Sequence, residues 1–210
     1  MGLRVLLVEG KNDQHVMWAL FKAHSVPDIF TVEKAGGVEA NGGVEQLLES
    51  VPVRLKASNL ERFGIVLDAD EDIQARWEQL RSRLIASGCE DIPAVPSPGG
   101  TVVQMKDGPR VGAWLMPDNQ VPGMLESFLA FLVPGSDKLL PLVDRFLDGI
   151  PTDDRRCPNA RLPKARIHAW LAVQEHPGKP LGQAITAKYL DAQRGMLTPF
   201  LDWIKAVFID

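Results

Sequence analysis

Three aliphatic stretches, each followed by a segment with helical periodicity, constrain the fold of this chain more than any other feature. The first stretch ends in Glu9-Gly10, as is typical of a strand buried on both faces. Asn12 or Asp13 can cap the helix that follows it. The three strands are expected at residues 3–8, 29–32 and 64–67. The first is followed by a helix with apolar positions at 16, 17, 20 and 21, the second by a helix at about 44–51, and the third by a helix that follows the acidic run 68–72 and extends to about 86. Successive β-α units of this kind predict a parallel sheet with right-handed crossovers.

The pattern changes after residue 100. Residues 101–105 and 110–116 are strand-like, and the Asp107-Gly108 turn between them predicts an antiparallel hairpin on the sheet edge. Further helices are expected at about 124–132, 137–148, 162–175, 181–194 and 198–208. The predicted fold class is therefore α/β: a mostly parallel sheet flanked by helices, with an edge β-hairpin, in residues 1–133, and a helical C-terminal extension packed on it in residues 134–210.

Composition narrows the class of protein. Hydrophobic residues make up 45% of the chain and charged residues 24%, which is typical of a globular domain and argues against disorder or a coiled coil. The longest apolar run, 128–133, is far shorter than the ~20 residues of a membrane helix, so no membrane partner is expected. Cys89 and Cys157 form no CxxC motif, which disfavours a zinc site and fits a cytoplasmic location.

The net charge of −4 is unevenly distributed. Residues 1–150 contain 14 Lys and Arg against 21 Asp and Glu (14 − 21 = −7), whereas residues 151–210 contain 9 against 6 (9 − 6 = +3). The chain therefore lacks the broad basic surface of many nucleic-acid-binding proteins. Binding to nucleic acid would need a local basic stripe, a bridging cation or a partner chain.

Carboxylates follow two of the predicted strands. Glu9 ends the first strand, and Asp68 and Asp70 end the third. Because parallel strands present their carboxyl ends at one edge of a sheet, and because side chains alternate with a period of two, we expect these three carboxylates to converge. Three neighbouring carboxylates repel one another unless a cation neutralises their charge. Mg²⁺, or alternatively Mn²⁺, is a divalent ion that binds such oxygen ligands. The alternative interpretation of the two aspartates is that they cap the next helix.

The segments that contain these carboxylates resemble known families. The segment LLVEGKND, with Glu9, Gly10 and Asp13, followed by IVLDADED, with Asp68 and Asp70, is similar to the Toprim domain of topoisomerases, bacterial primases and several nucleases. More narrowly, residues 111–119 (VGAWLMPDN) and 123–129 (GMLESFL) resemble the uncharacterised bacterial family named domain of unknown function 3226 (DUF3226).

The Toprim resemblance implies specific roles. The glutamate that matches Glu9 acts in acid-base or metal chemistry, and the aspartates that match Asp68 and Asp70 hold magnesium. Asp118 and Glu126 extend the acidic set, where a second cation could be held. The alternative interpretation is that Asp118 is a turn residue and Glu126 a residue of the first turn of a helix.

Basic residues are the candidates for contact with substrate. Lys11 could touch a phosphate, although an exposed loop lysine is more often solvated. Arg155 and Arg156 open a stretch with five basic residues in twelve, 155–166, which reads either as a phosphate-contacting loop or as a solvated linker. The tryptophans are expected in the core rather than as base-stacking platforms: Trp18, Trp77, Trp114, Trp170 and Trp203.

The predicted function is Mg²⁺-dependent hydrolysis of nucleic-acid phosphodiesters, with DNA or RNA as substrate. The first alternative is a non-catalytic regulatory subunit that binds nucleic acid or a protein partner such as an ATPase. The second is a phosphatase of the haloacid-dehalogenase type, in which the first aspartate of Asp-x-Asp is the nucleophile. In that family, however, the motif normally opens the chain, whereas here it follows the third predicted strand.

Overall fold

The computed structural model describes residues 2–37 and 42–210. Its strands are β1 Leu3–Val8, β2 Thr31–Lys34, β3 Leu60–Asp68, β4 Thr101–Gln104 and β5 Arg110–Met116. Its α-helices are α1 Lys11–Ala23, α2 Val44–Leu55, α3 Ile73–Ala86, α4 Leu125–Ala130, α5 Leu140–Asp148, α6 Leu162–Ala172, α7 Leu181–Thr186 and α8 Thr198–Phe208. Short 3-10 helices lie at Asn159–Arg161 and Gly195–Leu197.

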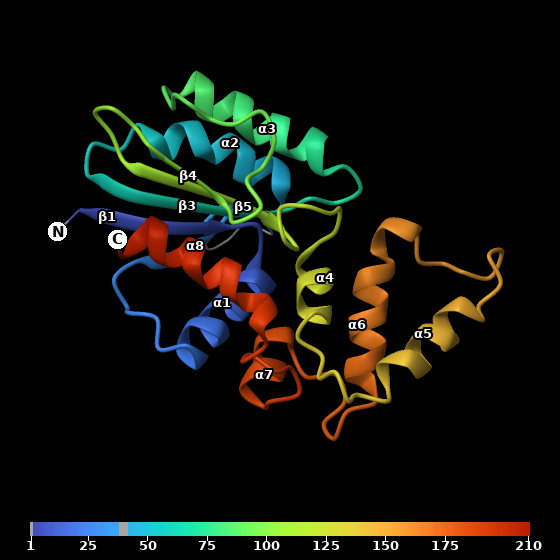
Figure 1. Cartoon of the computed structure of the whole chain (residues 1–210). Helices are drawn as coiled ribbons and strands as arrows, with labels where there is room; N and C mark the ends of the chain where they lie inside the picture. The colour runs from blue at the N-terminus through green and yellow to red at the C-terminus, as the bar shows by residue number, and fades with distance from the viewer. Residues whose placement is uncertain (1, 38–41) are drawn as a thin grey trace.

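Within the described residues the strands form a five-stranded sheet in the order β2-β1-β3-β5-β4. β1 pairs in parallel with β2 and β3, and β3 pairs in parallel with β5. β4 is antiparallel to β5 and lies at the edge, so the predicted edge hairpin is confirmed. Helices α2 and α3 cover one face of the sheet, and α1 and α8 cover the other (Figure 1). The mostly parallel α/β sheet flanked by helices is therefore also confirmed.

Close packing between sheet and C-terminal helix shapes the core. The buried side chains of α8 share one apolar cluster with residues of the sheet and α1, and they are Phe200, Trp203, Ile204, Val207 and Phe208. Gly64 and Gly112 are paired across β3 and β5, and a Cβ on Gly64 would lie 2.9 Å from the Phe208 ring. Glycine is needed at this pair because α8 lies directly against it. The expected division of the chain at residue 133 stays a prediction.

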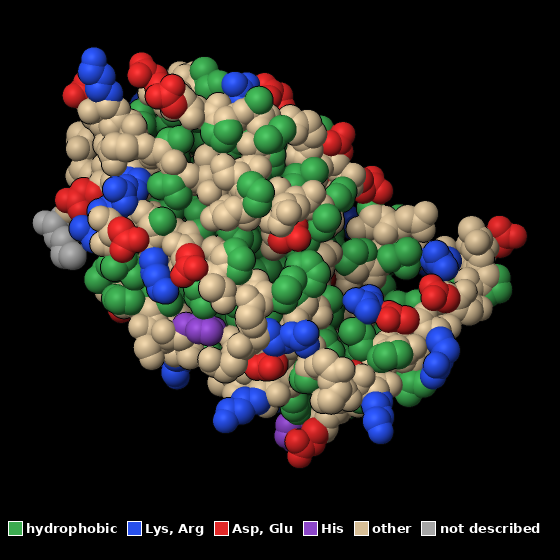
Figure 2. All heavy atoms as spheres, in the orientation of Figure 1, with side chains coloured by type: hydrophobic (Ala, Val, Ile, Leu, Met, Phe, Trp, Pro, Cys, Tyr) green, Lys and Arg blue, Asp and Glu red, His purple; other side chains and the backbone are tan. Residues whose placement is uncertain are grey.

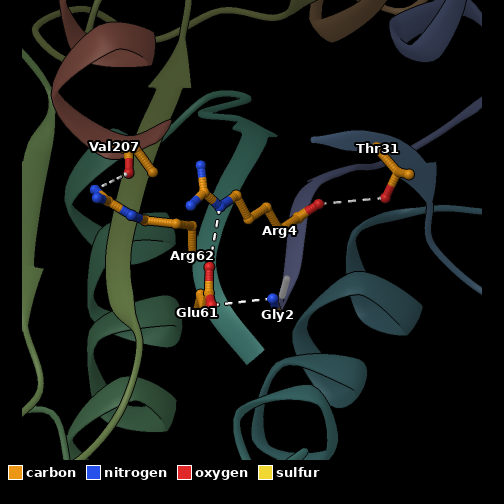
Figure 3. A network of polar contacts seen from close by, with 6 residues as sticks. All are labelled: Gly2, Arg4, Thr31, Glu61, Arg62 and Val207. Atoms are coloured by element: carbon orange, nitrogen blue, oxygen red, sulfur yellow. Dashed lines mark hydrogen bonds and ion pairs between the residues drawn. The ribbon is translucent and has the colours of Figure 1, made fainter. Parts of the chain in front are cut away.

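Arginines fasten the end of α8 to the sheet. Arg62 donates a hydrogen bond to the Val207 carbonyl (2.9 Å), and Arg110 donates one to that of Ala206 (2.8 Å). These bonds satisfy carbonyl groups that the end of the helix leaves without intrahelical partners. Beside them, Arg4 forms an ion pair with Glu61 (Figure 3).

Several predicted boundaries are wrong. The second strand occupies 31–34 rather than 29–32. The helix expected from 137 begins at Leu140, because the Asp137 carboxylate accepts hydrogen bonds from the Leu139 and Leu140 amides before it. The helix expected over 181–194 ends at Thr186, since Lys188 adopts a left-handed backbone conformation (φ 61°).

Four of the five tryptophans are at most 2% exposed, as predicted, and these are Trp77, Trp114, Trp170 and Trp203. The prediction was wrong for Trp18, which lies on α1 and is 48% exposed. None of the helices in the described residues combines the length and the apolar character that crossing a membrane requires.

Candidate functional site

A polar pocket of about 370 Å³ lies at the carboxyl ends of β1 and β3, where α1, α2 and α4 begin. We call it the acidic pocket, and its lining residues are Glu9, Gly10, Lys11, Asn12, Asp13, Gly42, Gly43, Asp68, Leu125, Glu126 and Lys164. The helix dipoles of α1 and α2 place partial positive charge at this end of each helix, which favours negative groups in the pocket. Of the predicted site residues, the structure brings Glu9, Asp68, Glu126 and Lys11 together here.

Glu9 and Asp68 are joined directly. The Asp68 amide donates a hydrogen bond to Glu9 Oε1 (2.7 Å), which ties the carboxyl end of β1 to that of β3. Burial raises the pKa of Glu9 to about 7, against the lowering effect of this hydrogen bond, and the nearby charges of Asp13 and Asp70 raise it further. Glu9 therefore exchanges its proton near neutral pH.

Asp68 is the last residue of β3, and its Oδ1 accepts a hydrogen bond from the Leu125 amide at the start of α4 (2.8 Å). Burial is the largest reason that its pKa lies well above the usual value, and the charges of Glu9, Asp13 and Glu126 add to it. The bond to Leu125 fixes one carboxylate oxygen, so the orientation of Asp68 is set by the backbone rather than by solvent.

Asp13 is a pocket residue to which the sequence analysis assigned no role beyond a cap. Its Oδ2 accepts a hydrogen bond from the Gly10 amide (3.2 Å) in the first turn of α1. Burial raises its pKa to about 6, and Glu126 contributes to the rise while Lys164 opposes it. A carboxylate in the first turn of a helix that starts beside a strand end was the sequence signal that could have placed it here.

Glu126 and Lys164 form an ion pair inside the pocket. Lys164 Nζ lies 3.2 Å from Glu126 Oε1, and the carboxylate side chain is only 4% exposed while the lysine is 48% exposed. A buried carboxylate needs a partner of opposite charge, and Lys164 supplies it from α6 in the C-terminal region. Sequence reasoning placed Lys164 only within a basic stretch, because nothing local connects residues 126 and 164.

Asp70 lies outside the acidic pocket. β3 ends at Asp68, and Asp70 has a left-handed backbone (φ 53°), so the period-two alternation does not extend to it. Its carboxylate forms an ion pair with Arg76, and it lines a separate hollow with Gly123 and Asn159. The expected convergence of the Asp68 and Asp70 side chains in one pocket is therefore not observed, although the charge of Asp70 is close enough to raise the pKa of Glu9.

The remaining predicted residues are also placed. Asp118 caps a turn, its Oδ1 accepting hydrogen bonds from the Gln120 and Val121 amides, and it does not line the acidic pocket. Arg155 donates to the Leu147 carbonyl (3.4 Å), while Arg156 is exposed without a partner among the described residues. Both lie in the segment between α5 and α6, which projects from the sheet (Figure 1). Lys11 is exposed at the rim of the pocket.

The pocket fits a hydrated cation better than a closed protein cage. No group of three or more His, Cys, Asp or Glu side chains in residues 2–37 and 42–210 is arranged to hold a metal ion. Glu9 and Asp68 each use one oxygen in a backbone hydrogen bond, and no described residue donates to the other oxygen of either carboxylate. Mg²⁺ is commonly held by one or two carboxylates together with water and substrate phosphate, so these residues fit it.

A family model described as Protein of unknown function (DUF3226) matches residues 3–209. The matched range includes the sheet, the acidic pocket and α8. Searches of curated proteins and of solved structures each found no match.

Proposed function

The chain belongs to the DUF3226 family, whose description states no activity, and we propose from the acidic pocket that it is a Mg²⁺-dependent phosphodiesterase acting on nucleic acid. The single observation that carries the proposal is the juxtaposition of Glu9 and Asp68, which lie 59 residues apart and are linked by a 2.7 Å hydrogen bond. The resemblance to Toprim nucleases supports the same roles for these two residues.

The residues of the pocket would have different roles in the reaction. Glu9, with a pKa of about 7, can donate a proton to the leaving oxygen or accept one from water at neutral pH. Asp68 would hold the cation, and the second oxygen of Glu9 would either carry the proton or join Asp68 as a ligand. When bound, Mg²⁺, or Mn²⁺ in its place, lowers the pKa of a water molecule and stabilises charge on phosphate oxygens. Lys11 at the rim can contact a neighbouring phosphate.

The test is metal-dependent cleavage. Purified protein is incubated with single-stranded and duplex DNA and RNA, with Mg²⁺, Mn²⁺ or EDTA. We expect cleavage in the presence of either metal ion, and a loss of roughly 10²- to 10⁴-fold in Glu9→Gln, as for removal of a general acid or base. Asp68→Asn should lose activity as well.

Exposed carboxylates provide matched controls. Glu49→Gln on α2 and Asp107→Asn in the β4–β5 turn should cleave at the wild-type rate. Cleavage that survives both pocket substitutions, or that is equal in EDTA, would remove the basis of the proposal.

A non-catalytic binding subunit is the second candidate. Two carboxylates of the region are held in ion pairs, Asp70 with Arg76 and Glu126 with Lys164, which favours a structural use of their charges. Binding of nucleic acid, or of a protein partner such as an ATPase, without turnover under any of these conditions would favour this role. Release of phosphate from a small monoester would instead favour the phosphatase alternative.

A further inference from the structure

One side of α1 forms a ridge that carries two lysines and two aromatic rings, of which Lys11, Trp18 and Lys22 are exposed and His15 is half-buried. Lys11, His15, Trp18 and Lys22 recur at i, i+4, i+7 and i+11, so they follow one side of the helix. The ridge is about 16 Å long, the length of roughly five stacked nucleotides at ~3.4 Å each. Its first residue, Lys11, lines the acidic pocket.

Trp18 is the residue that least fits a purely structural interpretation. It is 48% exposed, whereas the other four tryptophans are at most 2% exposed. Its ring is stacked on that of His15, with centroids 5.5 Å apart and planes inclined by 28°. A half-exposed indole held in place by a second ring is a preformed platform, because little side-chain freedom is lost when another flat ring stacks on it.

The surroundings of Trp18 provide room and positive charge. Trp18 and Lys22 line a hollow of about 420 Å³ whose walls include Phe21, Val26 and Phe30. The ammonium groups of Lys11 and Lys22 form no ion pair or hydrogen bond with any residue that the structure describes, so both are available to phosphates. Asp28 is the carboxylate that lines this hollow, and it is exposed at its edge.

We propose that the Lys11–Lys22 ridge of α1 binds single-stranded nucleic acid, with a base stacked on Trp18 and phosphates on the two lysines. An aromatic platform between cationic side chains is the combination that single-strand-binding surfaces use. In a duplex each base is stacked between its neighbours, so no base face is free to stack on Trp18. Binding of a single strand by the ridge does not depend on the chemistry in the acidic pocket. Because Lys11 also lines that pocket, the ridge could in addition lead a strand to it, and this second role rests on the proposed function.

The mixed charge of the surface bears on how tightly the ridge could bind nucleic acid. On the face of the molecule shown in Figure 2, acidic and basic side chains are interspersed over the surface. Affinity from phosphate contacts alone would therefore be modest, and the stacking contribution of Trp18 becomes decisive for binding.

Binding is measured without cleavage, in EDTA, by fluorescence anisotropy of labelled dT20, rU20 and a 20-base-pair DNA duplex. We expect dT20 or rU20 to bind more tightly than the duplex. Comparing dT20 with rU20 shows whether DNA or RNA is preferred. Trp18→Ala should weaken single-strand binding by about tenfold or more, whereas Trp18→Phe, which keeps a stacking ring, should retain most of it. Phe146→Ala, at a 63% exposed aromatic residue on α5, should have no effect.

Salt dependence tests the lysines separately. Each phosphate contact on a single strand contributes about 0.7 to the slope of log K against log salt, so Lys11→Ala/Lys22→Ala should reduce the slope by about 1.4. The control pair is Lys56→Ala/Lys106→Ala, at exposed lysines outside α1, and should leave the slope unchanged. Because Trp18 is the exposed tryptophan, dT20 should quench the tryptophan emission of the wild type and not that of Trp18→Phe.

The proposal is overturned if no single strand binds at 50 mM salt, if Trp18→Ala binds as well as the wild type, or if the duplex binds more tightly. A protein partner whose binding requires Trp18, with no single-strand binding, would reassign the ridge to protein docking. Metal-dependent cleavage without Trp18-dependent binding would leave the proposed function standing and remove the ridge. Trp18-dependent binding without cleavage would do the reverse.

Discussion

Replacing Glu9 by Gln should stabilise the metal-free protein at alkaline pH and leave its stability unchanged at acid pH. The pKa of Glu9 rises from 4.5 to about 7 on folding, so the folded state holds the proton more tightly than the unfolded state does. The free energy of unfolding therefore falls as pH rises from about 4.5 to about 7, where the folded carboxyl finally ionises. Gln remains neutral throughout and keeps a carbonyl oxygen to accept the hydrogen bond from the Asp68 amide.

The size of the effect follows from the shift. At 1.36 kcal/mol per pKa unit, the shift from 4.5 to about 7 corresponds to about 3 kcal/mol at pH 8.5. For a chain of this length that is roughly 6–12 °C in melting temperature. At pH 4.5 the folded carboxyl is protonated in the wild type, so the two proteins should differ by only a few tenths of a kcal/mol.

Urea unfolding followed by tryptophan fluorescence, in EDTA at pH 4.5 and 8.5, measures both free energies. Glu49→Gln, which removes an exposed carboxylate of α2, is the control and should change neither value appreciably. Equal stability of Glu9→Gln and wild type at pH 8.5, or destabilisation of the variant at both pH values, would refute the account of Glu9 as a buried, costly charge.

Three further predictions concern the pocket and the core. Mg²⁺ at 100 times its Kd should stabilise the wild type at pH 8.5 by about 2.7 kcal/mol, measured in a thermal-shift assay. The absence of a shift, or an equal shift in the Glu9→Gln/Asp68→Asn variant, would argue against a cation site. Lys164→Met should lower the free energy of unfolding by about 1–3 kcal/mol by leaving Glu126 unpaired, and adding Glu126→Gln should restore most of that loss; a double variant as unstable as the single one would contradict the pairing. Gly112→Ala should cost about 1–3 kcal/mol, because its methyl group would meet Val207 and Trp203, whereas Gly99→Ala faces open space and should be tolerated; similar unfolding curves for the two would contradict the close approach of α8.

The sequence predicted those parts of the fold that local patterns determine. The aliphatic run of β1, the amphipathic α3 and the Asp107-Gly108 hairpin are each encoded within about a dozen residues, and α8 was placed at its observed bounds. Boundaries were missed where a single contact decides them, as at Lys188, whose left-handed backbone ends α7.

The candidate site was predictable to the extent that topology alone brings strand ends together. Glu9 and Asp68 follow from the carboxyl ends of two adjacent parallel strands. Asp70 departs from the expectation because β3 ends at Asp68, two residues before it, and the backbone of Asp70 is left-handed. Lys164 enters the pocket through packing of α6 against α4, which no local pattern encodes. The exposure of Trp18 likewise depends on which side of α1 the rest of the chain covers.

The position of α8 has a consequence for how the protein acquires its structure during synthesis. The hydrogen bond between Arg62 and Val207 spans 145 residues, and that between Trp203 and Thr101 spans 102. Contacts so distant in sequence form slowly, and the β strands leave the ribosome well before residues 198–208. The part of the nascent sheet that α8 covers, including its paired glycines, therefore remains open to solvent and to chaperones until residues 198–208 have been synthesised.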